Sequence, residues 1–355
     1  MPRLSRRSGP AGARPATAAA RWSAELGEHV IALGWSPDGG RLAAASIGGP
    51  IAVFAAGTGE RIFELAGHDF GTMALAWSPD GQTLASSGQD GRIRLWSTAS
   101  GEALIALEGG ASWVARVAWS PGGDCLASAA GKVVRFWEPT GLLLGERRAH
   151  ASTVSDIAWR PTRSDRSQAV LAAAAYGALT LWNPVRPEPV DIYPWKGSSL
   201  ALAWSPDATY LATGDQDSTV HFWITRTGDD LQMWGYARKV RELSWDRASR
   251  FLATGGGHDV VVWDCAGQGP EGTTPLMLRA HKAFVSALAY QPNGDLLASG
   301  GDDGLVALWR PPRQARPLQR LEGAAGIAAL AWSPDGQALA VGTESGEVTV
   351  MPVVA

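Results

Sequence analysis

The chain has 355 residues, of which 45% are hydrophobic and 18% charged, so it holds enough apolar material for a well-buried core. A formal net charge of -3 excludes a general attraction to nucleic acid or to an anionic membrane, whose binders usually carry basic faces. No apolar run is long enough to span a bilayer, and two cysteines are too few for a disulfide framework.

Residues 1–20, MPRLSRRSGPAGARPATAAA, are basic, rich in Pro, Gly and Ala, and free of bulky apolar stretches. Their Arg pair resembles that of a twin-arginine export signal, but no hydrophobic segment follows it. We therefore expect a disordered leader at residues 1–20 and a cytoplasmic protein, a location that the low cysteine content also fits. The many Ala, Gly and Arg residues suggest a GC-rich bacterial genome.

A short pattern that reads WSPDG in its clearest copies recurs eight times along the rest of the chain, at spacings of 40 to 45 residues. Its copies begin at Trp35, Trp77, Trp119, Trp159, Trp204, Trp245, Tyr290 and Trp332. Such regular spacing indicates one supersecondary unit repeated through residues 21–355, with no separate domain.

The second repeat shows the expected elements most clearly. TMALAW (residues 72–77) predicts a first strand, and the Ser78–Gly81 segment predicts a type I turn, because Pro fixes the second position and Gly relieves the fourth. QTLASSG, RIRLW and EALIALEG predict the next three strands. No long segment has a 3.6-residue apolar period, so the fold class is all-β.

Four-stranded antiparallel sheets that are apolar on both faces bury themselves by stacking around an axis, which predicts a single closed β-propeller. Eight first strands predict eight blades, and a seven-bladed ring with one degenerate repeat is the alternative. The last repeat ends at its third strand, EVTVMPVVA. We therefore expect Arg21–Leu26 to supply the fourth strand of the last blade, with Trp22 in the seam.

A Gly-His or Ala-His pair, an LAS run, an Asp and a closing Trp accompany the WSPDG turns. The full set of polar residues occurs twice, as His68, Ser86, Asp90 and Trp96, and as His281, Ser299, Asp303 and Trp309. Together these motifs resemble the WD40-repeat family, over roughly residues 21–355. The resemblance implies a propeller that is closed by its N-terminal strand and binds partners on its loops.

A His, a Ser and an Asp within reach of one another also invite a hydrolase interpretation. We interpret both sets as structural networks instead, because each Trp can donate its indole N–H to the Ser hydroxyl, which meets the His ring, which meets the Asp. Repeat 5 carries Trp195 in place of the His, and repeat 4 lacks the Ser and the Asp. A catalytic set would not survive such losses.

No cofactor or metal is expected. His258 and Asp259 are separated from Asp264 and Cys265 by an extended VVVW segment at about 3.3 Å per residue, so one ion cannot contact both pairs. His221, in TVHFW, is predicted to be a hydrogen-bonded core or interblade histidine. Glycines occur in hairpin turns and not between a strand and a helix, so no phosphate loop is predicted.

In propellers of this family, the loops joining fourth to first strands and second to third strands form one rim, and partners often contact residues just after the Gly-His position. Among the residues three and five positions past the Gly-His position, the candidate partner-binding residues are His29, Met73, Trp113, Thr153, Ser155, Lys239, Arg241 and Phe284. Trp113 and Phe284 are the candidate anchors, because exposed aromatic residues are preferred at interfaces. The alternatives are that these two cap the channel and that Lys239 and Arg241 are an ordinary solvated pair.

The opposite rim carries three long Arg-rich segments, Arg160–Gln168, Asn183–Pro189 and Arg310–Arg320, interpreted either as soluble connections or as a docking surface for an acidic protein. The expected function is a non-enzymatic, monomeric scaffold that binds protein or peptide partners on its rim, and no nucleic acid or membrane. The alternatives are a channel-mouth ligand or metal sensor, and a hydrolase-type propeller enzyme that uses His29, Lys239 and Arg241.

Overall fold

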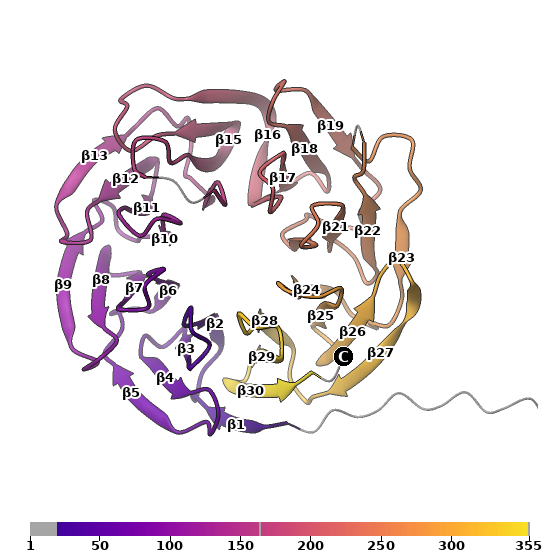
Figure 1. Cartoon of the computed structure of the whole chain (residues 1–355), viewed down its shortest axis with the longest axis horizontal. Coiled ribbons are helices and arrows are strands. Elements are labelled where there is room, and N and C mark those ends of the chain that lie inside the picture. The colour runs from indigo at the N-terminus through magenta and orange to yellow at the C-terminus, as the bar shows by residue number, and fades with distance from the viewer. Residues whose placement is uncertain (1–19, 163–164, 268, 354–355) are drawn as a thin grey trace, which may run out of the picture.

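Thirty strands and no helix make up the part of the chain that the computed structural model describes, residues 20–162, 165–267 and 269–353. The predicted leader, residues 1–20, lies outside this part except for its last residue. No described element is a helix that could cross a membrane. The strands form a ring of antiparallel sheets around a central axis (Figure 1), which confirms the predicted all-β propeller.

The first three sheets follow the chain in order. The first consists of β2 (Val30–Trp35), β3 (Arg41–Ser46), β4 (Ile51–Ala55) and β5 (Arg61–Leu65). The second consists of β6 (Thr72–Trp77), β7 (Thr83–Gly88), β8 (Arg92–Ser97) and β9 (Ala103–Glu108). The third consists of β10 (Arg116–Trp119), β11 (Leu126–Ala130), β12 (Val133–Trp137) and β13 (Leu143–Arg147).

The next sheet has six strands, and the three after it have four each. The six strands are β14 (Asp156–Trp159), β15 (Leu171–Trp182), β16 (Asp191–Trp204), β17 (Tyr210–Asp215), β18 (Val220–Ile224) and β19 (Asp230–Met233). Then come β20 (Leu243–Trp245), β21 (Phe251–Thr254), β22 (Val260–Asp264) and β23 (Leu276–Leu278). The following sheet has β24 (Val285–Tyr290), β25 (Leu297–Gly301), β26 (Leu305–Arg310) and β27 (Gln314–Glu322). The last has β28 (Ile327–Trp332), β29 (Ala338–Thr343), β30 (Glu347–Pro352) and the N-terminal β1 (Trp22–Glu25).

Each aromatic residue that begins a copy of the repeat pattern is the last residue of an inner strand. The eight inner strands β2, β6, β10, β14, β16, β20, β24 and β28 follow one another around the axis, and β28 packs against β2. The described residues form seven hydrogen-bonded sheets, as in the seven-bladed alternative. Eight inner strands fit into seven sheets because the six-stranded sheet supplies two of them, β14 and the second half of β16.

Indole hydrogen bonds between neighbouring inner strands explain why the aromatic residue recurs. Six of the seven pattern tryptophans donate their indole N–H to a backbone carbonyl of the preceding inner strand, at 2.9 to 3.2 Å. The Trp119 indole has no hydrogen-bond partner among the described residues. At Tyr290 the backbone N–H instead donates to Ser244 Oγ at 2.8 Å. These bonds stabilise the ring because each satisfies a polar group between two neighbouring inner strands.

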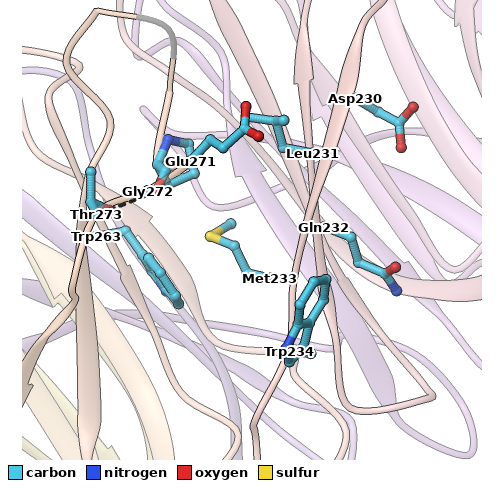
Figure 2. Close-up of a pocket in the computed structure, with 10 residues that line it drawn as sticks. Asp230, Leu231, Gln232, Met233, Trp234, Trp263, Glu271, Gly272 and Thr273 are labelled. Carbon is cyan, nitrogen blue, oxygen red and sulfur yellow. Dashed lines mark hydrogen bonds between the residues drawn. The ribbon is translucent and has the colours of Figure 1, made fainter.

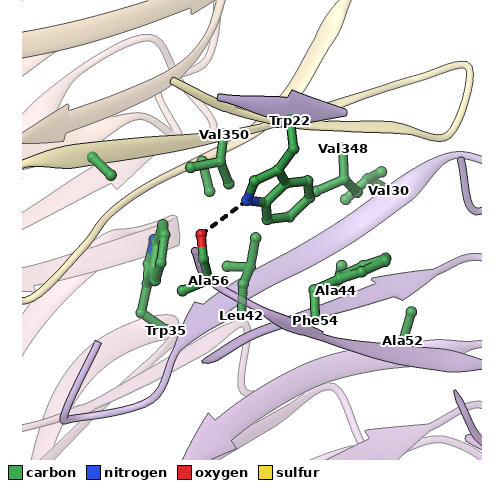
Figure 3. Close-up of a cluster of buried hydrophobic side chains, with 12 residues drawn as sticks. Trp22, Val30, Trp35, Leu42, Ala44, Ala52, Phe54, Ala56, Val348 and Val350 are labelled. Carbon is green, nitrogen blue, oxygen red and sulfur yellow. Dashed lines mark hydrogen bonds between the residues drawn. The ribbon is translucent and has the colours of Figure 1, made fainter. Parts of the chain in front are cut away.

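The N-terminal strand closes the ring as predicted. β1 pairs antiparallel with β30, with Trp22 opposite Val350 and Glu25 opposite Glu347. The Trp22 side chain points from the last sheet into the core of the first, where it packs on Phe54 (Figure 3).

The prediction of a long loop at Arg310–Arg320 is wrong, because β26 extends to Arg310 and β27 begins at Gln314. Pro317 lies within β27 and has no backbone N–H to donate. It is tolerated because β27 is an edge strand, whose open side makes no hydrogen bonds within the sheet.

Candidate functional site

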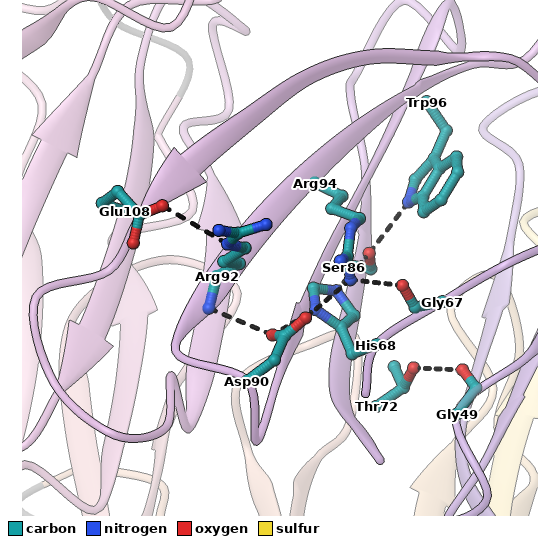
Figure 4. Close-up of polar contacts among 10 residues, drawn as sticks. All are labelled: Gly49, Gly67, His68, Thr72, Ser86, Asp90, Arg92, Arg94, Trp96 and Glu108. Carbon is teal, nitrogen blue, oxygen red and sulfur yellow. Dashed lines mark hydrogen bonds and ion pairs between the residues drawn. The ribbon is translucent and has the colours of Figure 1, made fainter. Parts of the chain in front are cut away.

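The His68 side chain is at the centre of a buried polar chain in the second sheet (Figure 4). Its Nδ1 lies 2.8 Å from Asp90 Oδ1, and its Nε2 lies 2.8 Å from Ser86 Oγ. The indole N–H of Trp96 donates to the same hydroxyl at 2.8 Å. Because that hydroxyl accepts from Trp96, its own proton can be donated to Nε2, which leaves the ring proton on Nδ1 for Asp90.

Burial lowers the pKa of His68 despite the hydrogen bond and the charge of Asp90, so the neutral ring is favoured. Burial opposes ionisation of Asp90 as well, but its bonds to His68 and to the Arg92 N–H, with the charge of Arg94, keep its pKa below the usual value. The Arg94 guanidinium pairs with Asp90 at 2.8 Å. Every member of the chain therefore has a partner.

The second copy has the same geometry. His281 Nδ1 lies 3.2 Å from Asp303 Oδ1, its Nε2 lies 2.8 Å from Ser299 Oγ, and the Trp309 indole donates to that hydroxyl at 2.8 Å. Ser86 and Ser299 are both fully buried. A substrate therefore cannot reach either hydroxyl in this conformation.

Three further repeats supply an acceptor to the closing Trp without the full polar set. The Trp182 indole donates directly to His150 Nε2 at 3.1 Å, and the Trp137 indole donates to Ser128 Oγ at 2.9 Å. In the sixth repeat the Trp263 indole donates to the Tyr236 hydroxyl at 2.9 Å. A hydrogen-bond acceptor for the closing Trp is thus supplied from different positions of the repeat.

His221 does not have the hydrogen bonds predicted for it. Its ring is buried against Trp195, with centroids 3.6 Å apart, and neither ring nitrogen has a hydrogen-bond partner in the part of the chain that the structure describes. The carboxylate of Asp230 lies 3.5 Å from Nδ1, which is too long for a normal bond. Trp195 stands at the repeat position of the usual His, and its indole N–H is also buried without a partner among the described residues. No group of metal-ligating side chains occurs among the described residues.

Backbone hydrogen bonds hold the predicted rim together. In five repeats a backbone N–H at the start of the second-to-third strand loop donates to a carbonyl in the fourth-to-first strand loop, at 2.9 Å. The carbonyl belongs to the residue three positions past the Gly-His position. The accepting residues are His29, Gly71, Ser198, Phe284 and Gly326, and the donors are Ile47, Gln89, Gln216, Asp302 and Glu344. Both kinds of loop on this rim are therefore fixed to one another.

The predicted rim residues differ in how much surface they present. Trp113 is 48% exposed, and Thr153 and Arg241 are exposed. Half-buried are His29, Met73, Ser155, Lys239 and Phe284.

Two of the half-buried rim residues already have partners within the chain. The Ser155 hydroxyl, directly before β14, donates to the carbonyls of Ala174 in β15 and Ser199 in β16, so it links the start of one inner strand to the next inner strand. The Phe284 ring lies between the Arg238 guanidinium, 4.1 Å away, and the His258 ring, 4.6 Å away.

Phe70 has the highest exposed fraction of the large apolar side chains among the described residues, and it is not one of the predicted rim residues. It is 83% exposed on the loop before β6 and has φ of +63°, a conformation that costs energy for a residue other than glycine. It precedes Gly71, the position that the counting selected. Ile47, in the loop from β3 to β4, and Tyr176, within β15, are also exposed.

The Arg side chains of the opposite rim are mostly paired. Arg166 bonds to Glu138 at 3.0 Å, Arg310 bonds to Asp295 at 3.1 Å, and Arg160 lies over the Trp204 ring. Residues 163–164 of the predicted Arg160–Gln168 loop lie outside the described residues.

Comparison with known proteins matches the repeats to one family. The family described as "WD domain, G-beta repeat" matches residues 59–97, 101–138, 191–223, 272–310 and 315–350. These segments together cover more than half of the chain.

Individual curated relatives match smaller parts of the chain. "THO complex subunit 3" of Arabidopsis thaliana is 29% identical over 168 residues, which are 46% of this chain and 50% of that protein. "Cell division cycle 20.1, cofactor of APC complex" of the same plant is 30% identical over 146 residues, 39% of this chain and 31% of that protein. The chain therefore spans half or less of the curated relatives it matches. A crystal structure of the computationally designed Ika8 protein is similar in fold, with a TM-score of 0.78, 22% identity and coverage of 93% of this chain and 98% of that one.

Proposed function

Since the chain belongs to the WD40-repeat family, we propose that it is a non-enzymatic scaffold that binds protein or peptide partners on the rim that carries Phe70 and Trp113. The observation that carries the proposal is the exposure of these two aromatic side chains, 83% and 48%, on loops of neighbouring repeats. Exposed aromatic residues are common anchors at interfaces because they bury a large area for few rotatable bonds.

The backbone hydrogen bonds that hold the loops of Phe70 and Trp113 in place support the same proposal. The Gly71 carbonyl after Phe70 accepts from the Gln89 N–H, and the Val114 N–H after Trp113 donates to the Gly88 carbonyl at 3.0 Å. Loops held in this way lose little conformational entropy on binding, so a modest contact area gives useful affinity. Phe284 is the third anchor of the proposal, on the far side of the same rim.

The relatives support a role within an assembly. Their names describe a complex subunit and a complex cofactor. The burial of Ser86 and Ser299 supports the absence of hydrolase chemistry at the two His-Ser-Asp sets.

We further propose a monomeric, cytoplasmic protein that binds neither nucleic acid nor membrane, supported by the net charge and by two free, buried cysteines. Burial raises the pKa of both thiols to about 12. The bacterial origin expected from composition stays a prediction, and the relatives named above are eukaryotic.

Affinity capture from the source cells tests the rim. Wild type, Phe70→Ala with Trp113→Ala, and Phe284→Ala serve as baits, and Leu142→Ala, an exposed apolar residue on the opposite rim, is the control. We expect the double variant to lose partners that wild type and Leu142→Ala retain. The same partners on all four baits would overturn the proposed surface.

A further inference from the structure

Three basic side chains lie close together on the rim, in the loop that joins β19 to β20, which we call the basic loop, residues 234–242. They are Arg238 and Lys239, which are half-buried, and Arg241, which is exposed. Lys239 and Arg241 form no side-chain hydrogen bond or ion pair with any described residue. Their charges are therefore available to a partner of opposite charge.

Arg238 is held in place by the Phe284 ring. Its guanidinium carbon lies 4.1 Å from the ring centre, and its backbone N–H donates to the Gly256 carbonyl at 3.0 Å. Its Nε is buried, and no described group accepts a hydrogen bond from its side chain. A guanidinium that stacks on a ring keeps its terminal N–H groups free in its own plane, where they match the two oxygens of a carboxylate.

The geometry of the repeat directs Arg241 toward the same ring. Arg241 occupies the position of Ser155 and Ser286 in their repeats. Each of those hydroxyls donates to the carbonyl of the fifth residue before the pattern aromatic of the next inner strand. For Arg241 the corresponding residue is Val285, directly after Phe284, so we expect its side chain to lean toward Phe284.

Glu242, the acidic neighbour of Arg241, is occupied by the backbone. Its Oε2 accepts from the Gly256 N–H at 3.3 Å and from the Arg241 N–H at 3.4 Å. Burial raises its pKa despite these bonds and the charge of Arg238. It forms no ion pair with either arginine among the residues that the structure describes.

Exposed acidic side chains follow on the rim beyond Phe284. Asp302 and Glu344 both lie beside Gly326, and Glu28 follows in the first repeat. None of the three is in an ion pair with another described group. A carboxylate that approaches the rim is therefore repelled on this side of Phe284 and attracted on the side of the basic loop.

The basic loop also borders a cavity on the side of the ring, between β19 and the loop that joins β22 to β23 (Figure 2). That loop has eleven residues, 265–275, whereas the corresponding loop before β19 has five, 225–229. The cavity has a volume of about 440 Å³, and Trp234 and Glu271 are among its lining residues. None of the described residues that line it is basic, so it does not attract a carboxylate.

We infer that the basic loop and Phe284 bind an acidic side chain, Asp or Glu, of the partner segment that occupies the rim, an inference that rests on the proposed function. The carboxylate pairs with Arg238 and Arg241, and the apolar part of the segment packs on the Phe284 ring. The charges of the rim also give the segment a direction, because its acidic residue lies away from Asp302 and Glu344.

Fluorine NMR of the full chain labelled with 4-fluorophenylalanine tests the inference, with Phe284→Leu assigning the resonance. The probe is acetyl-Ala-Glu-Glu-Ala-amide, and acetyl-Ala-Gln-Gln-Ala-amide is its uncharged twin. We expect the glutamate peptide to shift the Phe284 resonance saturably, and to bind at least about threefold more tightly than the glutamine twin at low salt.

Lys239→Gln with Arg241→Gln should weaken the glutamate peptide by about threefold or more. Arg186→Gln with Arg226→Gln removes the same charge from exposed positions of the opposite rim and should leave the affinity unchanged. The absence of a saturable shift, equal binding of the glutamine twin, or equal affinities in the two double variants would overturn the inference.

The aromatic rim variant separates this inference from the proposed function. Phe70→Ala with Trp113→Ala should leave the affinity for the glutamate peptide unchanged, because both rings lie in other repeats. Loss of captured partners in that variant, with no binding of the peptide to wild type, would overturn this inference and support the proposed rim. Peptide binding as expected, with no loss of captured partners in any aromatic variant, would overturn the proposed function.

Discussion

The indole N–H of Trp22 donates to the carbonyl oxygen of Ala56 at 2.9 Å, which joins the last sheet of the ring to the first. The Trp22 and Phe54 rings pack beside this bond with centroids 5.4 Å apart. The two ends of the repeat array are thus connected by one aromatic side chain as well as by the backbone pairing of β1 with β30.

Trp22→Ala should lower the free energy of unfolding by about 3–5 kcal/mol, because it deletes a buried aromatic side chain and leaves a cavity. Urea unfolding measures the loss. Trp234→Ala, which removes an exposed indole, is the matched control and should change stability little. Equal melting temperatures for wild type and Trp22→Ala would contradict the closure by Trp22.

Trp77→Phe and Trp119→Phe make the same chemical change at equivalent positions of adjacent repeats. The Trp77 indole donates to the Gly34 carbonyl at 2.9 Å, whereas the Trp119 indole has no partner within residues 20–162, 165–267 and 269–353. Trp77→Phe should therefore be more destabilising by about 1 kcal/mol, the usual contribution of one buried hydrogen bond. Urea unfolding of both variants side by side gives the difference, and an equal loss would show that the indole bonds do not stabilise the ring.

Ser86→Ala should cost about 1–3 kcal/mol of unfolding free energy, because it leaves the Trp96 indole N–H and His68 Nε2 buried without a partner. Ser299→Ala should cost a similar amount through Trp309 and His281. Neither change should reduce partner capture. Binding lost in stably folded Ser86→Ala would mean that the network acts directly in recognition.

Phe70→Gly should be more stable than Phe70→Ala by about 1 kcal/mol, because glycine adopts the +63° φ of this position without strain. Both variants remove the exposed ring and should capture fewer partners. Thermal melting reports the first effect and affinity capture the second. If the alanine variant were the more stable, this loop would not be strained by its φ.

Mild acid should destabilise the fold. Burial lowers the pKa of His68, His150, His221 and His281 below the ordinary 6.5, so below that value the unfolded chain binds protons that the folded chain does not. The free energy of unfolding should therefore fall from about pH 7 to about pH 5.5, as urea titrations at a series of pH values would measure. Constant stability across this window would contradict the burial of neutral histidines.

Asp215 opposes this trend, since burial raises its pKa from 3.8 to about 6. As the pH falls through 6 the folded state takes up this proton before the unfolded state does, which adds stability. Asp215→Asn removes that contribution, so its stability should decline more steeply below pH 6 than that of wild type, by up to about 1.4 kcal/mol per pH unit. Parallel curves would show that Asp215 is ionised in the fold.

Features that depend on spacing within one repeat could be predicted. The strand order and the His68–Ser86 and Trp96–Ser86 pairs follow from pleated geometry, because 18 or 10 residues along the same hairpins return the chain to adjacent positions. The missing fourth strand of the last repeat predicted closure by Arg21–Leu26, since an open sheet edge must be paired or protected.

Features that depend on contacts between repeats could not be predicted from the sequence. The exposure of Phe70, the stacking of Phe284 on Arg238 and His258, and the cavity between Trp234 and Glu271 each involve side chains or loops whose surroundings lie in another repeat. The 45-residue spacing from Trp245 to Tyr290 contained the signal of an added loop but not its position against β19.

The sequence alone therefore determined the repeating unit, its strands and its internal hydrogen bonds, because residues close along the chain meet through local geometry. Only the tertiary structure decided how eight inner strands share seven sheets and which side chains remain exposed, because burial depends on neighbours that the chain reaches only after closing the ring.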